Sequence, residues 1–281
     1  MSYLDHINRC NHYTLTARFP FLIDGVRYGF VTQEFAQLLN QFPDVFTWTQ
    51  TELKLSPKLN TAQKRTNAVA EVLSILRTQG LFAAWNDELF GIKNNFDDPE
   101  VMSIQRAAVA YFGLRAYGVH VNGLVNTSQG QKLWVATRAK NKNTFPGMLD
   151  HIVAGGQPAG TGLLENVIKE ADEEASIPVA LSSQAKLKST ITYCGESTQG
   201  LKPDTLFCFD LQLPKEFIPQ SNDGEVESFE LISLEKVASI INTTEQFKPN
   251  CNLVIIDLLI RKGVIDNRDN ELSQRLRQPL P

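Results

Sequence analysis

The segment 148–178, MLDHIVAGGQPAGTGLLENVIKEADEEASIP, constrains the fold of this chain more than any other. Residues 149–154 have the apolar character of a strand, and the following GGQPAG (155–160) prevents regular structure. A helix is predicted next, since apolar residues recur at helical spacing until Pro178 ends it: Leu164, Val167, Ile168, Ala171 and Ala175. The segment therefore predicts a strand, a glycine-rich loop and a helix in direct succession.

Three glutamates, Glu170, Glu173 and Glu174, lie on another face of the predicted helix. Like charges at this spacing destabilise a helix by roughly 0.2–0.5 kcal/mol per pair, and Lys169 cannot neutralise three carboxylates. A bound cation offsets the repulsion, and carboxylate oxygens suit a hard ion such as Mg²⁺ or Mn²⁺, which leaves positions for water and phosphate. A solvated acidic face is the commoner explanation of such a cluster, but the glycine-rich loop in front of it favours a metal site.

Residues 155–177 resemble the Nudix box, which reads G-x₅-E-x₇-R-E-apolar-x-E-E-x-G-apolar. The alignment on the acidic core places Gly155 at the first glycine and Lys169 at the arginine. Thr161 stands where the box has its first glutamate, and Ser176 where it has its second glycine. Glu165, one turn along, is a partial substitute for that glutamate. The types that match the box are Glu170, Ala171, Glu173, Glu174 and Ile177.

The resemblance extends over essentially the whole chain. Its further segments are GVHVNG (118–123), residues 134–138, FPGMLDHIVAGG (145–156), DGEVESFEL (223–231) and FKPNCNLVIIDLLIRKG (247–263). Together they are similar to one Nudix subgroup, which resembles the N-terminal half of fungal thiamine pyrophosphokinase and related stand-alone proteins. That subgroup tolerates the same departures from the box.

The resemblance implies Mg²⁺ or Mn²⁺ held chiefly by Glu170 and Glu174, with Glu173 assisting as ligand or as base through a water. These three glutamates are the predicted catalytic residues. The family often takes a further acidic ligand from a later segment, and Glu225 is the candidate here, although a solvated strand edge is the commoner explanation of such a residue.

The reaction that the resemblance implies is hydrolysis of a diphosphate linkage. The narrower expectation is thiamine diphosphate or its oxidised or damaged analogues, cut to monophosphate and phosphate. Two alternatives stay open. One is hydrolysis of nucleoside diphosphate derivatives such as ADP-ribose, nucleotide sugars or coenzyme A, and the other is a Nudix fold that binds a diphosphate ligand without cleaving it.

Cations precede the glycine-rich loop at Arg138, Lys140 and Lys142. They suit diphosphate oxygens, with a basic surface loop as the alternative. Arg138 is favoured because it directly follows a predicted strand. The predicted substrate-binding residues are Arg138, Lys142 and the pair Gly155 and Gly156, whose backbone can approach a phosphate closely.

The chain of 281 residues is long enough for two domains, which we place at 1–112 and 113–281. The first is predicted as a smaller α+β unit with a hairpin at 21–31, a helix at about 61–78 and a helix-like segment at 103–113. Substrate recognition and formation of a homodimer are both open roles for it. The second is strand-rich, as expected of a Nudix α/β/α sandwich with a mixed sheet, so the fold class is α+β.

Composition excludes several partners. A net charge of −4 and a pI near 5.7 provide no basic field for nucleic acid, and no apolar run reaches the roughly 18 residues of a membrane span. Four scattered cysteines and the absence of a signal-peptide pattern predict a cytoplasmic protein with reduced thiols. The expected partner is therefore a small-molecule diphosphate.

Overall fold

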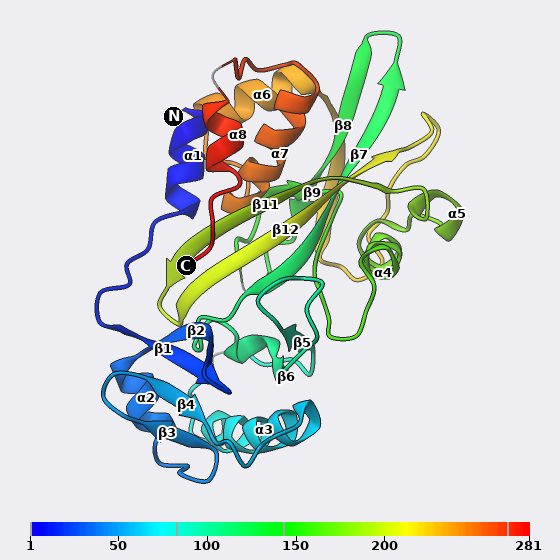
Figure 1. Ribbon diagram of the computed structural model, residues 1–281. Helices are drawn as coiled ribbons and strands as arrows, with labels where there is room; N and C mark the ends of the chain where they lie inside the picture. Colours follow the sequence, from blue (N-terminus) through cyan, green and yellow to red (C-terminus); the bar gives the residue numbers. More distant parts are fainter. Residues whose placement is uncertain (1, 83, 143, 269) are drawn as a thin grey trace.

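The computed structural model describes residues 2–82, 84–142, 144–268 and 270–281, and shows a smaller front sheet beside a larger one (Figure 1). The front sheet has the strand order β2-β1-β4-β3. Its elements are β1 (Arg18–Ile23), β2 (Val26–Thr32), α2 (Gln33–Leu39), β3 (Phe46–Trp48), β4 (Leu53–Leu55) and α3 (Ala62–Thr78).

Local sequence signals account for most of the front unit, by which we mean residues 18–108. The predicted hairpin is confirmed, and it turns at Asp24 and Gly25, which both have positive φ, of 50° and 78°. The predicted helix at 61–78 is confirmed as α3, whose first turn is capped by the Thr61 hydroxyl accepting from Lys64 N at 3.2 Å. Its apolar face is buried in the core that it shares with the front sheet, through Val69, Val72, Leu73 and Leu76.

The helix predicted at 103–113 is wrong. This region instead forms β6 (Met102–Gln105), paired with β5 (Leu89–Ile92), and then a single 3₁₀ turn at Arg106–Ala108. Met102 and Ile104 are both buried, which is the alternation of a strand with one face in the core. This alternation, and not the helical spacing of the residues that follow, matches the structure formed here.

The second sheet has seven strands in a mixed arrangement, of order β11-β12-β7-β8-β13. The central strand β7 runs parallel to β12 and antiparallel to β8 and β10, while β9 pairs with β8. The strands are β7 (Ala116–Thr127), β8 (Gly130–Arg138), β9 (Leu149–His151), β10 (Val153–Gly156), β11 (Lys186–Ser197), β12 (Gly200–Gln212) and β13 (Val226–Ser233).

Helices cover both faces of this sheet, which confirms the predicted α/β/α sandwich and the α+β class (Figure 1). One face carries α4 (Leu163–Ala175) and α5 (Val179–Ser182), and the other carries α6 (Leu234–Thr243), α7 (Pro249–Arg261) and α8 (Glu271–Arg275). The first helix, α1 (Tyr3–Cys10), also packs on the second face, where His6 Nε2 lies 2.7 Å from Ile241 O. Among the described residues, no helix is long and apolar enough to cross a membrane.

Helix α4 ends at Ser176, which takes the left-handed conformation with φ 51° and ψ 37° that glycine adopts more easily. The Ser176 hydroxyl donates to Gln220 O at 2.7 Å. We expect Ser176→Gly to be more stable than Ser176→Ala by about 1 kcal/mol, because both lose this hydrogen bond and only glycine avoids the left-handed strain. Urea unfolding of the two variants measures the difference, and equal stability would show that the backbone carries no strain here.

Candidate active site

The glycine-rich loop is fastened to the start of α4. Glu165 caps the helix by accepting from Gly162 N at 3.2 Å, one turn beyond Thr161. The buried Asn166 donates its amide to Gly156 O at 2.8 Å. Val167, Ala171 and Ala175 are fully buried beneath the sheet. The predicted strand–loop–helix segment is therefore a fixed unit, and it presents its glutamates beside the strand that precedes it.

Glu174 reaches furthest into the sheet. Its Oε2 accepts from Ala154 N at 2.7 Å, and among the described residues no hydrogen bond reaches its other oxygen. Burial raises the pKa of Glu174 well above its usual value, and the nearby charges of Asp150 and Glu170 raise it further. The Ala154 hydrogen bond and the charge of Lys248 lower this pKa, but burial outweighs them, so the carboxylate form is disfavoured at this depth.

Glu170 lies directly against the glycine-rich loop, with 13% of its side chain exposed. A Cβ at Gly155 would come within 2.4 Å of Glu170 Cδ, so only glycine leaves room for this carboxylate. Burial raises the pKa of Glu170, an effect that Lys169 partly offsets from 3.2 Å. Glu173 is more open, at 47% exposed, and lies 2.8 Å from the same Lys169 Nζ.

The donor set fits a hard divalent ion. Glu174 offers an oxygen with no protein donor among the described residues, and burial and mutual repulsion disfavour the charges of Glu170 and Glu174, a cost that a dication removes. The carbonyl of Gly155 faces β7, because a Cβ on Gly118 would lie 3.1 Å from it. Glu170 and Glu174 are thus the two glutamates of α4 that could hold a divalent ion.

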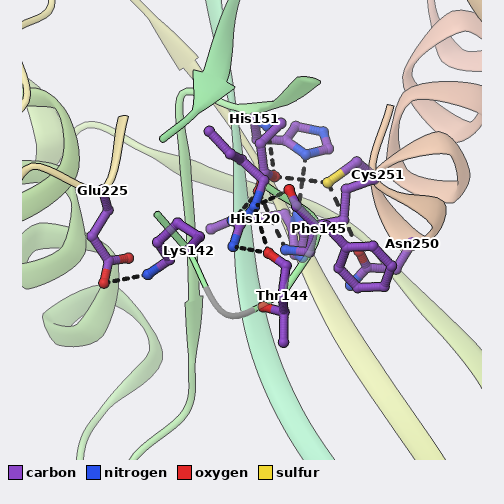
Figure 2. A network of polar contacts seen from close by, with 12 residues as sticks. His120, Lys142, Thr144, Phe145, His151, Glu225, Asn250 and Cys251 are labelled. Atoms are coloured by element: carbon purple, nitrogen blue, oxygen red, sulfur yellow. Dashed lines mark hydrogen bonds and ion pairs between the residues drawn. The ribbon is translucent and has the colours of Figure 1, made fainter. Parts of the chain in front are cut away.

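The predicted residues outside the box have partners of their own. Arg138 donates to Asp150 Oδ2 at 2.8 Å and to Thr144 O at 2.9 Å. Lys142 forms an ion pair with Glu225, and Figure 2 shows this pair apart from the buried group around His120. Arg138 therefore holds the loop after β8. The assignments of Arg138 and Lys142 to substrate and of Glu225 to metal remain predictions.

A buried carboxylate, Asp150, and a largely covered ammonium, Lys248, lie near Glu174, and no sequence pattern pointed to either. Asp150 accepts from Arg138 and lies 3.3 Å from Lys248 Nζ. Although burial raises the pKa of Asp150, the charge of Lys248 and other neighbours hold it well below the usual range. Lys248 lies almost a hundred residues away in sequence, so no local pattern joins it to Asp150. The only sequence feature that could have pointed to Asp150 and Lys248 is that each lies in a segment that carries the family resemblance.

The front unit forms one wall beside the glycine-rich loop. A Cβ at Gly156 would lie 2.6 Å from Phe90 Cζ and 3.7 Å from Arg106 Cζ. Ala159 N donates to Leu89 O at 2.8 Å, which fastens β5 to the loop. Arg106 is paired with Glu88 at 2.8 Å and remains 52% exposed. A cation from the front unit thus borders the loop on which a phosphate would lie.

The chain is similar to known proteins along nearly its whole length. Residues 116–251 match the family "NUDIX domain". Residues 2–116 match the family "Domain of unknown function (DUF4743)". Nudix hydrolase 20, chloroplastic, and Nudix hydrolase 24, chloroplastic, both from Arabidopsis thaliana, are each 40% identical to this chain. The matches cover 98% and 94% of this chain and 77% and 73% of those proteins. A solved structure of DR0079 from Deinococcus radiodurans is 22% identical, with a TM-score of 0.43 over 59% of this chain and 97% of its own.

Proposed function

Because this chain belongs to the Nudix hydrolase family, we propose that it hydrolyses a diphosphate linkage. The proposed substrate is thiamine diphosphate or an oxidised or damaged analogue, cut to monophosphate and phosphate. This substrate class is supported by the positions of the segments that resemble the thiamine pyrophosphokinase-related subgroup. GVHVNG supplies His120, FPGMLDHIVAGG supplies Asp150, and FKPNC supplies Lys248, and these side chains lie together beside Glu174. Three of the segments that resemble the subgroup therefore lie on one side of the predicted catalytic site.

The protein's part in the reaction follows from the positions of its glutamates. Mg²⁺ or Mn²⁺, when bound, withdraws charge from the phosphate oxygens and lowers the pKa of water. Glu170 and Glu174 would hold the ion, and the hydrogen bond from Ala154 N fixes the direction of the Glu174 carboxylate. Glu173 is exposed enough to accept a proton through a water, while Lys169 spans Glu170 and Glu173 and orients both.

The front unit is proposed to take part in substrate recognition through Arg106. We expect Arg106→Met to raise KM about 10- to 100-fold with little change in kcat, because a charge-assisted hydrogen bond to a phosphate is worth about 1.5–3 kcal/mol. The matched control is Arg77→Met, since Arg77 lies over the Trp85 ring, on α3 of the same unit. Steady-state kinetics decide the point. An unchanged KM for Arg106→Met would remove Arg106 from the substrate site.

The substrate class is tested by product analysis. The full chain is incubated, with and without Mg²⁺, with thiamine diphosphate, oxythiamine diphosphate, ADP-ribose, a nucleotide sugar or coenzyme A. The products are identified by mass spectrometry. We expect Mg²⁺-dependent formation of the monophosphate from the thiamine compounds. Faster cleavage of the nucleotide compounds would transfer the proposal to nucleoside diphosphate derivatives. Binding without Mg²⁺ and without turnover would instead indicate a non-catalytic diphosphate-binding module.

A further inference from the structure

A second group of side chains with metal-binding chemistry is buried beside the catalytic site. It consists of His120 on β7, Asp150 and His151 on β9, and Cys251 on α7. Each offers one ligand atom, these atoms all lie within 4.8 Å of one another, and all four residues are buried. Figure 2 shows His120, His151 and Cys251 gathered around the same point. Two imidazoles, a thiol and a carboxylate make a different donor set from the glutamates of α4.

The internal distances suit a small tetrahedral ion. His120 Nδ1 lies 3.1 Å from His151 Nδ1, and Cys251 Sγ lies 2.7 Å from Asp150 Oδ1. Zn²⁺ binds nitrogen, oxygen and sulfur at about 2.0–2.3 Å, so a tetrahedral ion holds its ligand atoms roughly 3.3–3.8 Å apart. Small movements of the four side chains therefore bring them to the ligand spacing.

The two oxygens of Asp150 face different neighbours. Oδ1 faces the Cys251 thiol, whereas Oδ2 receives Arg138 at 2.8 Å and Lys248 at 3.3 Å. A ligating carboxylate is commonly oriented by hydrogen bonds from outside the metal site, and here the two cations serve that purpose. Oδ1 can thus bind an ion while Oδ2 keeps its ion pairs.

The two histidines are in the state that a metal requires. Burial lowers the pKa of His151 to about 4 and places that of His120 well below its usual value, so both rings are neutral at pH 7. The two Nδ1 atoms face each other at 3.1 Å, so one ring now donates to the other, and a bound ion would replace that hydrogen bond.

We propose that His120, Asp150, His151 and Cys251 bind one Zn²⁺ in a closed structural site. On binding, the Cys251 thiol releases its proton to solvent, and the thiolate and the Asp150 carboxylate balance the two charges of the ion. Thiolate and imidazole ligands favour Zn²⁺ over Mg²⁺, so this site is chemically distinct from the one at Glu170 and Glu174. The ion would join β7, β9 and the start of α7, and the proposal does not depend on the substrate.

Cobalt reports on the proposed site, because Co²⁺ replaces Zn²⁺ and a thiolate ligand gives an intense charge-transfer absorption. The full chain is stripped with a chelator and titrated with Co²⁺ and then with Zn²⁺. We expect one equivalent of Co²⁺ with thiolate absorption, displaced by one equivalent of Zn²⁺. The double variant Glu170→Gln/Glu174→Gln should behave in the same way, which separates this site from the catalytic one. Absence of thiolate absorption from the unaltered chain overturns the proposal whatever the variants do.

The ligand assignment is tested by a matched pair of cysteine variants. Cys251→Ser should lose the thiolate absorption and bind Zn²⁺ roughly 100-fold more weakly or worse. Cys208→Ser, a change at another buried free cysteine, on β12, should keep both properties. Persistence of the absorption in Cys251→Ser would overturn the assignment. If Cys251→Ser does not fold, loss of the absorption in His120→Gln supports the site and its retention contradicts it.

Discussion

Replacing Glu174 by glutamine is expected to abolish Mg²⁺-dependent turnover while leaving the protein folded. A metal at a phosphate site supplies several kcal/mol of charge stabilisation, so loss of a ligand should lower kcat by about 10²- to 10⁴-fold. Folding should survive, because glutamine still offers an oxygen to Ala154 N and places no charge where burial disfavours one. Phosphate release under saturating Mg²⁺ and substrate gives the rate, and thermal unfolding gives the stability.

The control for this variant is Asp172→Asn, which removes the same charge from the same helix at an exposed position. It should keep near-normal turnover, since a general loss of negative charge along α4 does not remove a ligand. Full activity in Glu174→Gln would exclude Glu174 from the metal site. Equal loss in both variants would show that the net charge of the helix matters and not the ligand.

Sequence predicted the parts of the site that are determined by local patterns. The helical spacing of Val167, Ala171 and Ala175 indicated the buried face of α4, and all three are fully buried. Leu164 of the same predicted stripe is 40% exposed, because it lies in the first turn, at the edge of the covered face. Glu170, Glu173 and Glu174 were grouped correctly on one helix, but periodicity could not rank their depth. That ranking depends on Ala154 and Gly155 of β10, which give Glu174 a hydrogen bond and Glu170 a close packing surface.

Features set by distant partners were not predicted. The single strand expected at 149–154 divides at the fully buried Ile152 into β9 and β10, because the chain there changes its pairing from β8 to β7. The polar tail at 270–281 is predicted from its sequence to be mobile, but part of it packs on the second sheet. Leu276 is fully buried, and its carbonyl accepts from Thr192 N of β11 at 3.0 Å. Three leucines spaced four residues apart in a polar tail do not show which of them reaches the sheet.

Replacing Gly155 by alanine is expected to lower kcat/KM by about 10²-fold, because misplacing a catalytic group by about 1 Å costs this much. The added Cβ would lie 2.4 Å from Glu170 Cδ and 2.6 Å from its Oε2, so the carboxylate must move. Gly155 is not among the glycines with positive φ, and the effect is therefore steric and not a matter of backbone conformation. Titration of the activity with Mg²⁺ should show weaker metal binding as well as slower turnover.

Gly162→Ala is the matched control, since it adds the same methyl group to the same loop. Its Cβ would find its nearest atom, Glu165 Oε2, at 3.7 Å, and Gly162 has an ordinary φ of −71°. This variant should keep its Mg²⁺ dependence and its turnover, with at most a small loss of stability at the helix start. If Gly155→Ala retained normal Mg²⁺ affinity and turnover, Glu170 could be displaced without consequence, and the metal would have to be held without it. Selective loss in Gly155→Ala would instead show that the family's first glycine is required here for the room it leaves to a carboxylate.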